Sequence, residues 1–207
     1  TEKTGVDFPG EAIGYLPPVE QWSATSIANI PFGQGVSITS LQLARSLSAI
    51  ANGGELVTPH FLLEGPEGFD LETTWPKKRA ISAEAASATR EVLKAVVTEG
   101  TGKPATVPGY EVAGKTGTAQ KPRADGKGYA GGGYVGSFAG FLPADDPQVL
   151  IVVTLDEPSG AIYGGVVAAP VFSEVAQFAV AHLKIPPSSV RSVQPGDVGT
   201  STTEQAP

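Results

Sequence analysis

Apolar residues recur at helical spacing in three stretches of the chain. In the first, the apolar positions of residues 43–50 share one face, which predicts a helix. Thr39 and Gln42 stand three residues apart in the pattern of a capping box, which is typical of a helix start. The Asn-Gly-Gly sequence at 52–54 favours a left-handed backbone, so we expect the helix to end there.

Two further helices are predicted towards the C-terminus. One begins near Ser82 and stops at Gly100, with Glu84 in its first turn, where the helix dipole favours a negative charge. The other begins at Pro170, a residue that the first helical turn tolerates, and its apolar side chains recur at helical spacing as far as His182. We expect this last helix to lie on a sheet.

Between these two helices the pattern changes to the alternation of β-strands. Strands are predicted at 110–118, 134–142 and 149–155, joined by a glycine-rich loop and a short polar turn. The order strand, loop, strand, turn, strand implies an antiparallel meander. The strand at 149–155 is the most apolar, so we expect it at the centre of the sheet, and a further short strand is expected at 56–63. Helices combined with antiparallel strands indicate an α+β (α/β) fold.

Composition narrows the classes of function. The chain carries 14 basic and 21 acidic side chains, and its pI near 4.8 argues against binding to a nucleic-acid backbone. Cysteine is absent and only two histidines occur, which excludes thiolate chemistry and disfavours a metal centre built from these ligands. No apolar run approaches the ~20 residues of a membrane-spanning helix.

The two ends of the chain differ from its middle. Methionine is absent, so Thr1 is not a translation start, and we expect a processed chain or part of a longer protein. Residues 1–38 are interrupted by Gly and Pro and predict loops. The Ser/Thr/Pro-rich residues 188–207 have little to bury and are expected to be disordered, which leaves 1–187 as the folded part.

Residues 109–116 match the phosphate-binding pattern G-x-x-x-x-G-K-[ST]. Together with Asp156 and Glu157, which follow an apolar strand, they make a Mg-dependent nucleotide hydrolase an alternative function. The backbone of such a loop wraps a phosphate and leads directly into a helix. Here Gly117 and Pro122 follow the motif, and both residues disfavour a helix. The sequence context therefore argues against nucleotide binding.

Residues 115–118 read Lys-Thr-Gly-Thr on a predicted strand, which is a signature of serine acyl-transferases. At the edge of a sheet, such a strand can pair with a peptide substrate as one more strand. Alternation places Lys115 and Gly117 on one face and Thr116 and Thr118 on the other. The pleat alone therefore does not bring all these side chains to one site.

This box resembles that of class B penicillin-binding proteins, the D,D-transpeptidases of bacterial cell-wall division and elongation. Further similarities occur in the order of the family and cover the chain to about Pro187. They lie at 4–11, 32–54, 137–140 and 164–172. The resemblance implies the fold shared by penicillin-binding proteins and serine β-lactamases, a central antiparallel sheet covered by helices, of which this chain is a part.

The resemblance also implies a role for each residue of the box. Lys115 would act in catalysis by polarising the site, and Thr116 and Thr118 would hold the carboxylate of a stem peptide or a β-lactam. Gly117 would let the substrate approach the strand, and the backbone N–H of Thr118 would form half of an oxyanion hole. A serine would attack the penultimate D-Ala carbonyl, and an amine of a second stem peptide would take the acyl group. No metal or organic cofactor is implied.

Two motifs that the family needs are not found in the chain. No serine stands three positions before any lysine, so S-x-x-K is missing, and neither Asn29 nor Asn52 belongs to an S-x-N motif. We therefore expect the C-terminal portion of a transpeptidase domain, inactive towards penicillin by itself.

The partners of this portion would be the N-terminal remainder of the same protein and membrane proteins of the division or elongation complex. An upstream anchor would place the domain outside the cytoplasmic membrane. The alternatives are a non-catalytic scaffold relative and a serine β-lactamase.

Overall fold

The computed structural model describes residues 2–123, 128–129 and 131–188. The predicted disordered tail, apart from Ser188, lies outside the described residues. Within them, no helix combines the length and the apolar character that crossing a membrane would require.

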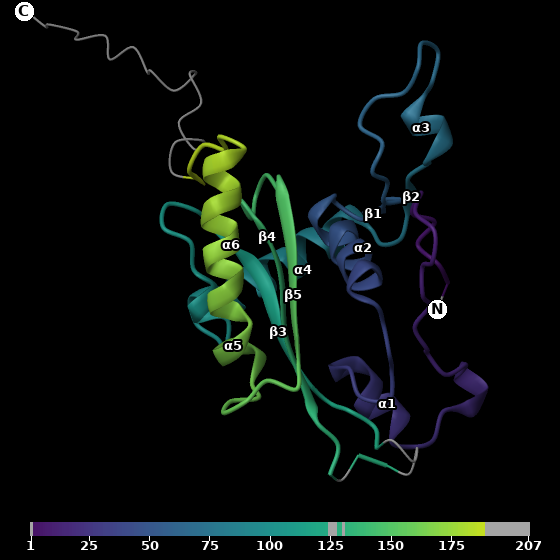
Figure 1. Ribbon diagram of the computed structural model, residues 1–207, viewed down its shortest axis with the longest axis vertical. Coiled ribbons are helices and arrows are strands. Elements are labelled where there is room, and N and C mark those ends of the chain that lie inside the picture. The colour runs from purple at the N-terminus through teal and green to yellow at the C-terminus, as the bar shows by residue number, and fades with distance from the viewer. Residues whose placement is uncertain (1, 124–127, 130, 189–207) are drawn as a thin grey trace, which may run out of the picture.

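A three-stranded antiparallel sheet forms the centre of the molecule (Figure 1). Its strands, in spatial order, are β3 (Ala113–Gln120), β4 (Tyr134–Leu142) and β5 (Val149–Asp156). The predicted antiparallel meander is therefore confirmed. The first strand begins three residues later than predicted, because the backbone groups before it bond outside the ladder: Tyr110 N donates to the Val107 carbonyl, and Glu111 N donates to Ser188 Oγ.

Within the described residues, β5 lies at the edge of the sheet and not at its centre, where 149–155 was expected. β4 lies between β3 and β5, and most of β5 is only half-buried. β5 is apolar because its side chains pack in both directions, Ile151 and Val153 into one core cluster and Leu150 and Val152 into the other. An edge strand covered on both faces has the same composition as a central strand, so the pattern of side chains could not distinguish the two positions.

The strand predicted at 56–63 is mostly absent. Only β1 (Glu55–Leu56) is formed, and it pairs with β2 (Lys78–Arg79) as a two-stranded antiparallel sheet. Pro59 has no N–H group to donate to a ladder, which explains why the strand does not continue.

The three predicted long helices are confirmed. They are α2 (Ser40–Ala51), α4 (Ala83–Thr98) and α6 (Ala169–His182). The capping box of α2 is complete, because the Thr39 hydroxyl accepts from Gln42 N at 3.1 Å and Gln42 Oε1 accepts from Thr39 N at 2.9 Å. The Ser82 hydroxyl caps α4 by accepting from Ala85 N.

The other elements are short and join these parts. They are η1 (Val19–Gln21), α1 (Ser26–Asn29), η2 (Ile30–Phe32), α3 (Leu71–Thr74), η3 (Lys103–Ala105) and α5 (Gly164–Val167). Most of residues 2–38 is loop, as predicted, with the first three of these helices as single turns.

Helices cover both faces of the sheet and form two hydrophobic cores (Figure 1). On one face, α6 and η3 pack against the sheet around Phe138 and Phe172, whose rings meet edge to face with centroids 4.7 Å apart. On the other face, Leu47 of α2 and Leu93 of α4 pack on Phe141. Residues at and just before the start of β3 therefore pack into both cores, while no strand of the described residues pairs with the outer edge of β3.

Lys94 of α4 joins this helix to two neighbouring segments. Its ammonium lies 3.3 Å from Asp145 in the β4–β5 turn, 3.5 Å from Glu111 before β3 and 3.6 Å from Glu91. Burial favours neutral Lys94, but the hydrogen bond to Asp145 and the three negative charges raise its pKa above the ordinary value. Burial likewise favours neutral Asp145, yet its contacts with Glu111 and Lys94 hold the pKa of its carboxyl below the ordinary value.

We predict that Lys94→Met lowers the free energy of unfolding by about 1 kcal/mol at neutral pH. Because the pKa of Asp145 is lowered in the folded state, its carboxylate stabilises the fold above the ordinary pKa of 3.8. This stabilisation is lost as the pH falls through the folded-state pKa. Because the pKa of Lys94 is raised in the folded state, its ammonium stabilises the fold below the ordinary pKa of 10.5. This stabilisation is lost as the pH rises through the folded-state pKa. Urea denaturation should therefore show a smaller effect of the substitution at about pH 2.5.

Lys103→Met, at an exposed lysine of η3, is the matched control. Equal losses at both pH values would contradict the assignment.

Candidate active site

The Lys-Thr-Gly-Thr box lies on β3, at a margin of the sheet. β3 pairs with β4 along its whole length, Lys115 opposite Ala139 and Gly117 opposite Ser137. In the described part of the chain, no strand pairs with the other edge of β3. Lys115 and Thr118 are exposed, whereas Thr116 and Gly117 are half-buried. An extended peptide could therefore add to this margin through backbone hydrogen bonds.

The two threonine side chains turn towards the face that α5 covers. The Thr116 and Thr101 hydroxyls share a hydrogen bond of 2.8 Å, and Thr118 Oγ1 accepts from the backbone N–H of Gly164 at 3.1 Å. The Lys115 ammonium instead donates to the backbone carbonyl of Thr116 at 3.0 Å. The structure therefore keeps the alternation of the strand, and no hydrogen bond joins Lys115 to either hydroxyl in the residues described.

The bond from Gly164 leaves the Thr118 hydroxyl able to bind an anion. A hydroxyl has one donor hydrogen and two acceptor lone pairs. Because Thr118 accepts from Gly164, its oxygen is held in place while its hydrogen stays available to a carboxylate. Thr118 can thus contribute to a site at the margin although its oxygen is engaged on the side of α5.

Two glycines allow the strands and α5 to approach closely around Thr118. A Cβ atom on Gly117 would collide with the Ser137 hydroxyl of β4. A Cβ atom on Gly164 would overlap the backbone oxygens of Gly117 and Ser137. The N-terminus of α5 therefore sits directly on β3 and β4, and only glycine at position 164 permits the bond to Thr118.

An ion pair fixes the end of β3 relative to β5. The Lys121 ammonium lies 2.9 Å from Asp156 and 2.8 Å from Glu157. Its hydrogen bonds to Glu157 and Asp156 raise the pKa of Lys121 above the ordinary value. Asp156 and Glu157, which could suggest a Mg²⁺ site in the sequence, thus bind Lys121 next to the end of the strand that carries the Lys-Thr-Gly-Thr box.

The nucleotide-binding alternative is not supported by the backbone. A phosphate loop would pass from Thr116 into a helix, but β3 continues as a strand to Gln120. Gly114, which would belong to the loop, is buried in the ladder opposite Gly140. These residues cannot curl around a phosphate in this fold.

The sequence did not reveal all the residues of this site. Thr101, which bonds to Thr116, lies between two glycines after α4 and carries no motif. Ser137 and Gly164 lie within stretches that resemble the family. The sequence therefore indicated that both residues belong near the Lys-Thr-Gly-Thr box, but it did not indicate which residues they contact. Those contacts arise from the pairing of β3 with β4 and from the packing of α5.

Comparison with known proteins agrees with this geometry. Residues 1–177 match the family model described as the penicillin-binding protein transpeptidase domain. The chain belongs to this transpeptidase family. The nucleotide hydrolase is therefore not favoured, and the fold is that of the transpeptidase domain of class B penicillin-binding proteins.

Individual relatives of this transpeptidase chain are similar over most of its length. Stage V sporulation protein D of Bacillus subtilis is 42% identical, and the match covers 90% of this chain and 29% of that protein. The probable peptidoglycan D,D-transpeptidase PbpC of Pseudomonas aeruginosa is 39% identical over 89% of this chain and 31% of its own length. Penicillin binding protein 3 of Mycobacterium tuberculosis, solved in complex with aztreonam, superimposes with a TM-score of 0.76 at 37% identity, covering 89% of this chain and 44% of that one. The chain thus spans about a third of the length of these curated relatives.

Proposed function

We propose that this chain supplies the substrate-binding strand of a longer peptidoglycan D,D-transpeptidase. The observation that carries the proposal is the open margin of β3, which presents Lys115 to Thr118 in a chain of the transpeptidase family. A stem peptide ending in D-Ala-D-Ala pairs with this margin, and its terminal carboxylate accepts from the hydroxyls of Thr116 and Thr118. A β-lactam binds in the same place.

The chemistry is an acyl transfer in two steps. A serine from the remainder of the protein attacks the carbonyl of the penultimate D-Ala, the C–N bond to the last D-Ala breaks, and that residue leaves with a proton. The amine of a second stem peptide then attacks the acyl-enzyme, forms the cross-link and returns the serine hydroxyl. Lys115 supplies positive charge beside the reacting group, and the Thr118 backbone N–H donates to the oxyanion.

The other parts of the proposal concern the protein outside this chain. The S-x-x-K and S-x-N motifs come from the remainder of the same protein, which packs against this chain. An upstream segment anchors the protein, so that the domain acts outside the cytoplasmic membrane with partners of the division or elongation machinery. The names of the relatives support a role in cell-wall synthesis, since they include a probable peptidoglycan D,D-transpeptidase and a penicillin-binding protein.

Labelled penicillin tests the proposal directly. We expect the full-length protein that contains this chain to form a covalent adduct that survives denaturation, and preincubation with unlabelled penicillin should abolish the labelling. The chain alone should form no adduct, because it lacks a serine three positions before a lysine. A full-length protein that is folded but stays unlabelled would refute the enzymatic role and favour a non-catalytic scaffold. Rapid hydrolysis of the drug would identify a β-lactamase instead.

A further inference from the structure

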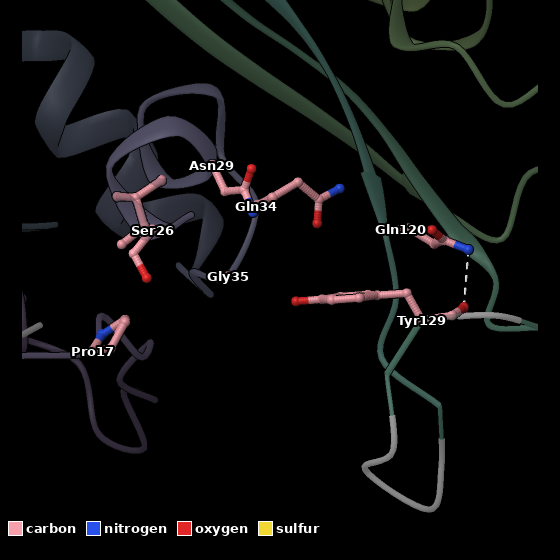
Figure 2. A pocket seen from close by; sticks show the side chains of 8 residues that line it. Pro17, Ser26, Asn29, Gln34, Gly35, Gln120 and Tyr129 are labelled. Atoms are coloured by element: carbon pink, nitrogen blue, oxygen red, sulfur yellow. Dashed lines mark hydrogen bonds between the residues drawn. The ribbon is translucent and has the colours of Figure 1, made fainter. Parts of the chain in front are cut away.

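Two features of the structure border the Lys-Thr-Gly-Thr box without a role in the proposed reaction. One is a cavity of about 300 Å³ beyond the end of β3, where Gln120 and Tyr129 face the segment that contains α1 (Figure 2). None of the residues that line this cavity belongs to the box. The other feature is Thr101, whose hydroxyl bonds directly to the Thr116 hydroxyl at 2.8 Å. Thr101 can therefore influence a substrate through a residue of the box.

The backbone around Thr101 is fixed by the turn that ends α4. Gly100 N donates to the Ala95 carbonyl at 3.1 Å. Gly102 N donates to the Val96 carbonyl at 2.9 Å. The peptide groups on both sides of Thr101 are thus tied to the last turns of a helix that itself packs on the sheet. Because its backbone is held in this way, the Thr101 side chain has a defined position beside β3.

The start of α5 covers the contact between the two threonines. A Cβ atom on Gly165 would collide with the Thr101 carbonyl oxygen, and it would lie 3.4 Å from the Thr116 methyl group. Glycine at position 165 therefore lets α5 pack directly against both residues. Thr116 is half-buried, whereas Thr101 is exposed. The pair of hydroxyls thus lies between α5 and the margin of the sheet.

The hydrogen bond between these two hydroxyls can run in either direction. Each hydroxyl has one hydrogen to donate. If Thr116 donates to Thr101, that hydrogen is not available to a carboxylate. If Thr101 donates instead, the Thr116 oxygen is held in place and its hydrogen remains free for a ligand. Thr118 already has this second arrangement, because its oxygen accepts from Gly164 N. Binding of a carboxylate at Thr116 therefore requires Thr101 to be the donor.

We infer that Thr101 is a positioning residue for the substrate carboxylate: its hydroxyl donates to Thr116, which in turn donates to the terminal carboxylate of a stem peptide or a β-lactam. The inference rests on the proposed function, because it uses the carboxylate site on β3. Hydrogen bonds in such a chain polarise one another, and a bond to a charged acceptor is stronger than one between neutral groups. Thr101 thus acts through Thr116, and its effect depends on the negative charge of the ligand.

Acylation of the full-length protein by a penicillin and by the methyl ester of the same penicillin measures this role. The two compounds share the reactive ring and differ in the negative charge, and mass spectrometry follows the covalent adduct. We expect Thr101→Val, which exchanges the hydroxyl for a methyl group, to lower the second-order rate constant for the acid by about tenfold. The rate constant for the ester should change by less than about twofold. Thr101→Ser keeps the hydroxyl and should stay within about threefold of the wild type.

A double-mutant cycle separates positioning from direct contact with the ligand. In a Thr116→Val background, Thr101→Val should cause less than about twofold further loss, because the hydroxyl through which it acts is gone. Thr98→Val is the matched control, since the Thr98 hydroxyl donates to the Lys94 carbonyl of its own helix. This control should keep the wild-type rates with both compounds. Thermal unfolding reports whether each variant is folded, and Thr101→Ala gives the same comparison with a smaller side chain.

Four results would overturn the inference while adduct formation by the wild type leaves the proposed function intact. They are an unchanged rate for the acid in Thr101→Val, equal losses for acid and ester, a loss in Thr101→Ser as large as that in Thr101→Val, and an undiminished effect of Thr101→Val in the Thr116→Val background. A wild-type protein that is folded but forms no adduct would overturn both.

Discussion

Lys115→Met in the full-length protein should lower the second-order rate constant of penicillin acylation by about 100-fold or more. Lys115 is exposed at the open margin of β3, and its ammonium donates to the carbonyl of Thr116, within the strand segment that would contact the substrate. Methionine keeps an unbranched side chain but removes the charge. The loss therefore reports electrostatic stabilisation of the oxyanion-like transition state rather than packing.

The acylation rate can be followed with labelled penicillin over a range of drug concentrations. Lys78→Met, at an exposed position of β2, is the control, and its rate constant should match that of the wild type. Thermal unfolding of both variants should be similar, since neither side chain is buried. A change of less than about threefold for Lys115→Met would show that the lysine is only a solvated side chain on an edge strand.

Phe172→Ala should lower the free energy of unfolding by about 3–5 kcal/mol. Phe172 lies on α6, is completely buried, and packs edge to face against Phe138 of the central strand β4. Its removal would leave a cavity between the helix and the sheet. The same cavity would loosen the face on which α5 holds Thr118, so penicillin acylation should also decrease.

Phe178→Ala, also on α6, is the matched control, because it removes an aromatic ring without removing a buried contact. Phe178 is 71% exposed and stacks on His182 at the surface of the helix. Phe178→Ala should therefore change the free energy of unfolding by less than about 1 kcal/mol in urea or thermal denaturation. Similar losses for the two variants would mean that the core does not lie between α6 and the sheet.

The sequence predicted the parts of this fold whose signals are local. A capping box needs only Thr39 and Gln42, and a helix needs only apolar residues at the right spacing, so α2, α4 and α6 begin within a residue of their predicted starts. The strands were predicted for the same reason, through alternation and the turns between them. The family was also indicated, because short motifs keep their order along the chain.

The sequence could not predict which strand would be central, because β4 and β5 both bury side chains on two faces. Nor did it indicate that Thr101 would meet Thr116, that Gly164 would hold Thr118, or that α1 and β3 would line a common cavity. Each of these contacts joins residues that are distant along the chain, and none leaves a periodic or local pattern.

The amino-acid sequence by itself determined the strand that bears Lys115 to Thr118, the helices around it and the class of protein. It did so because backbone conformation and helix capping depend on neighbouring residues. The tertiary structure alone decided that no strand of the described residues pairs with the outer edge of this strand, which of its hydroxyls already form hydrogen bonds, and what lies beyond its end. Those properties depend on how β3 packs against β4, α5 and α1, which is set by close contacts between distant segments.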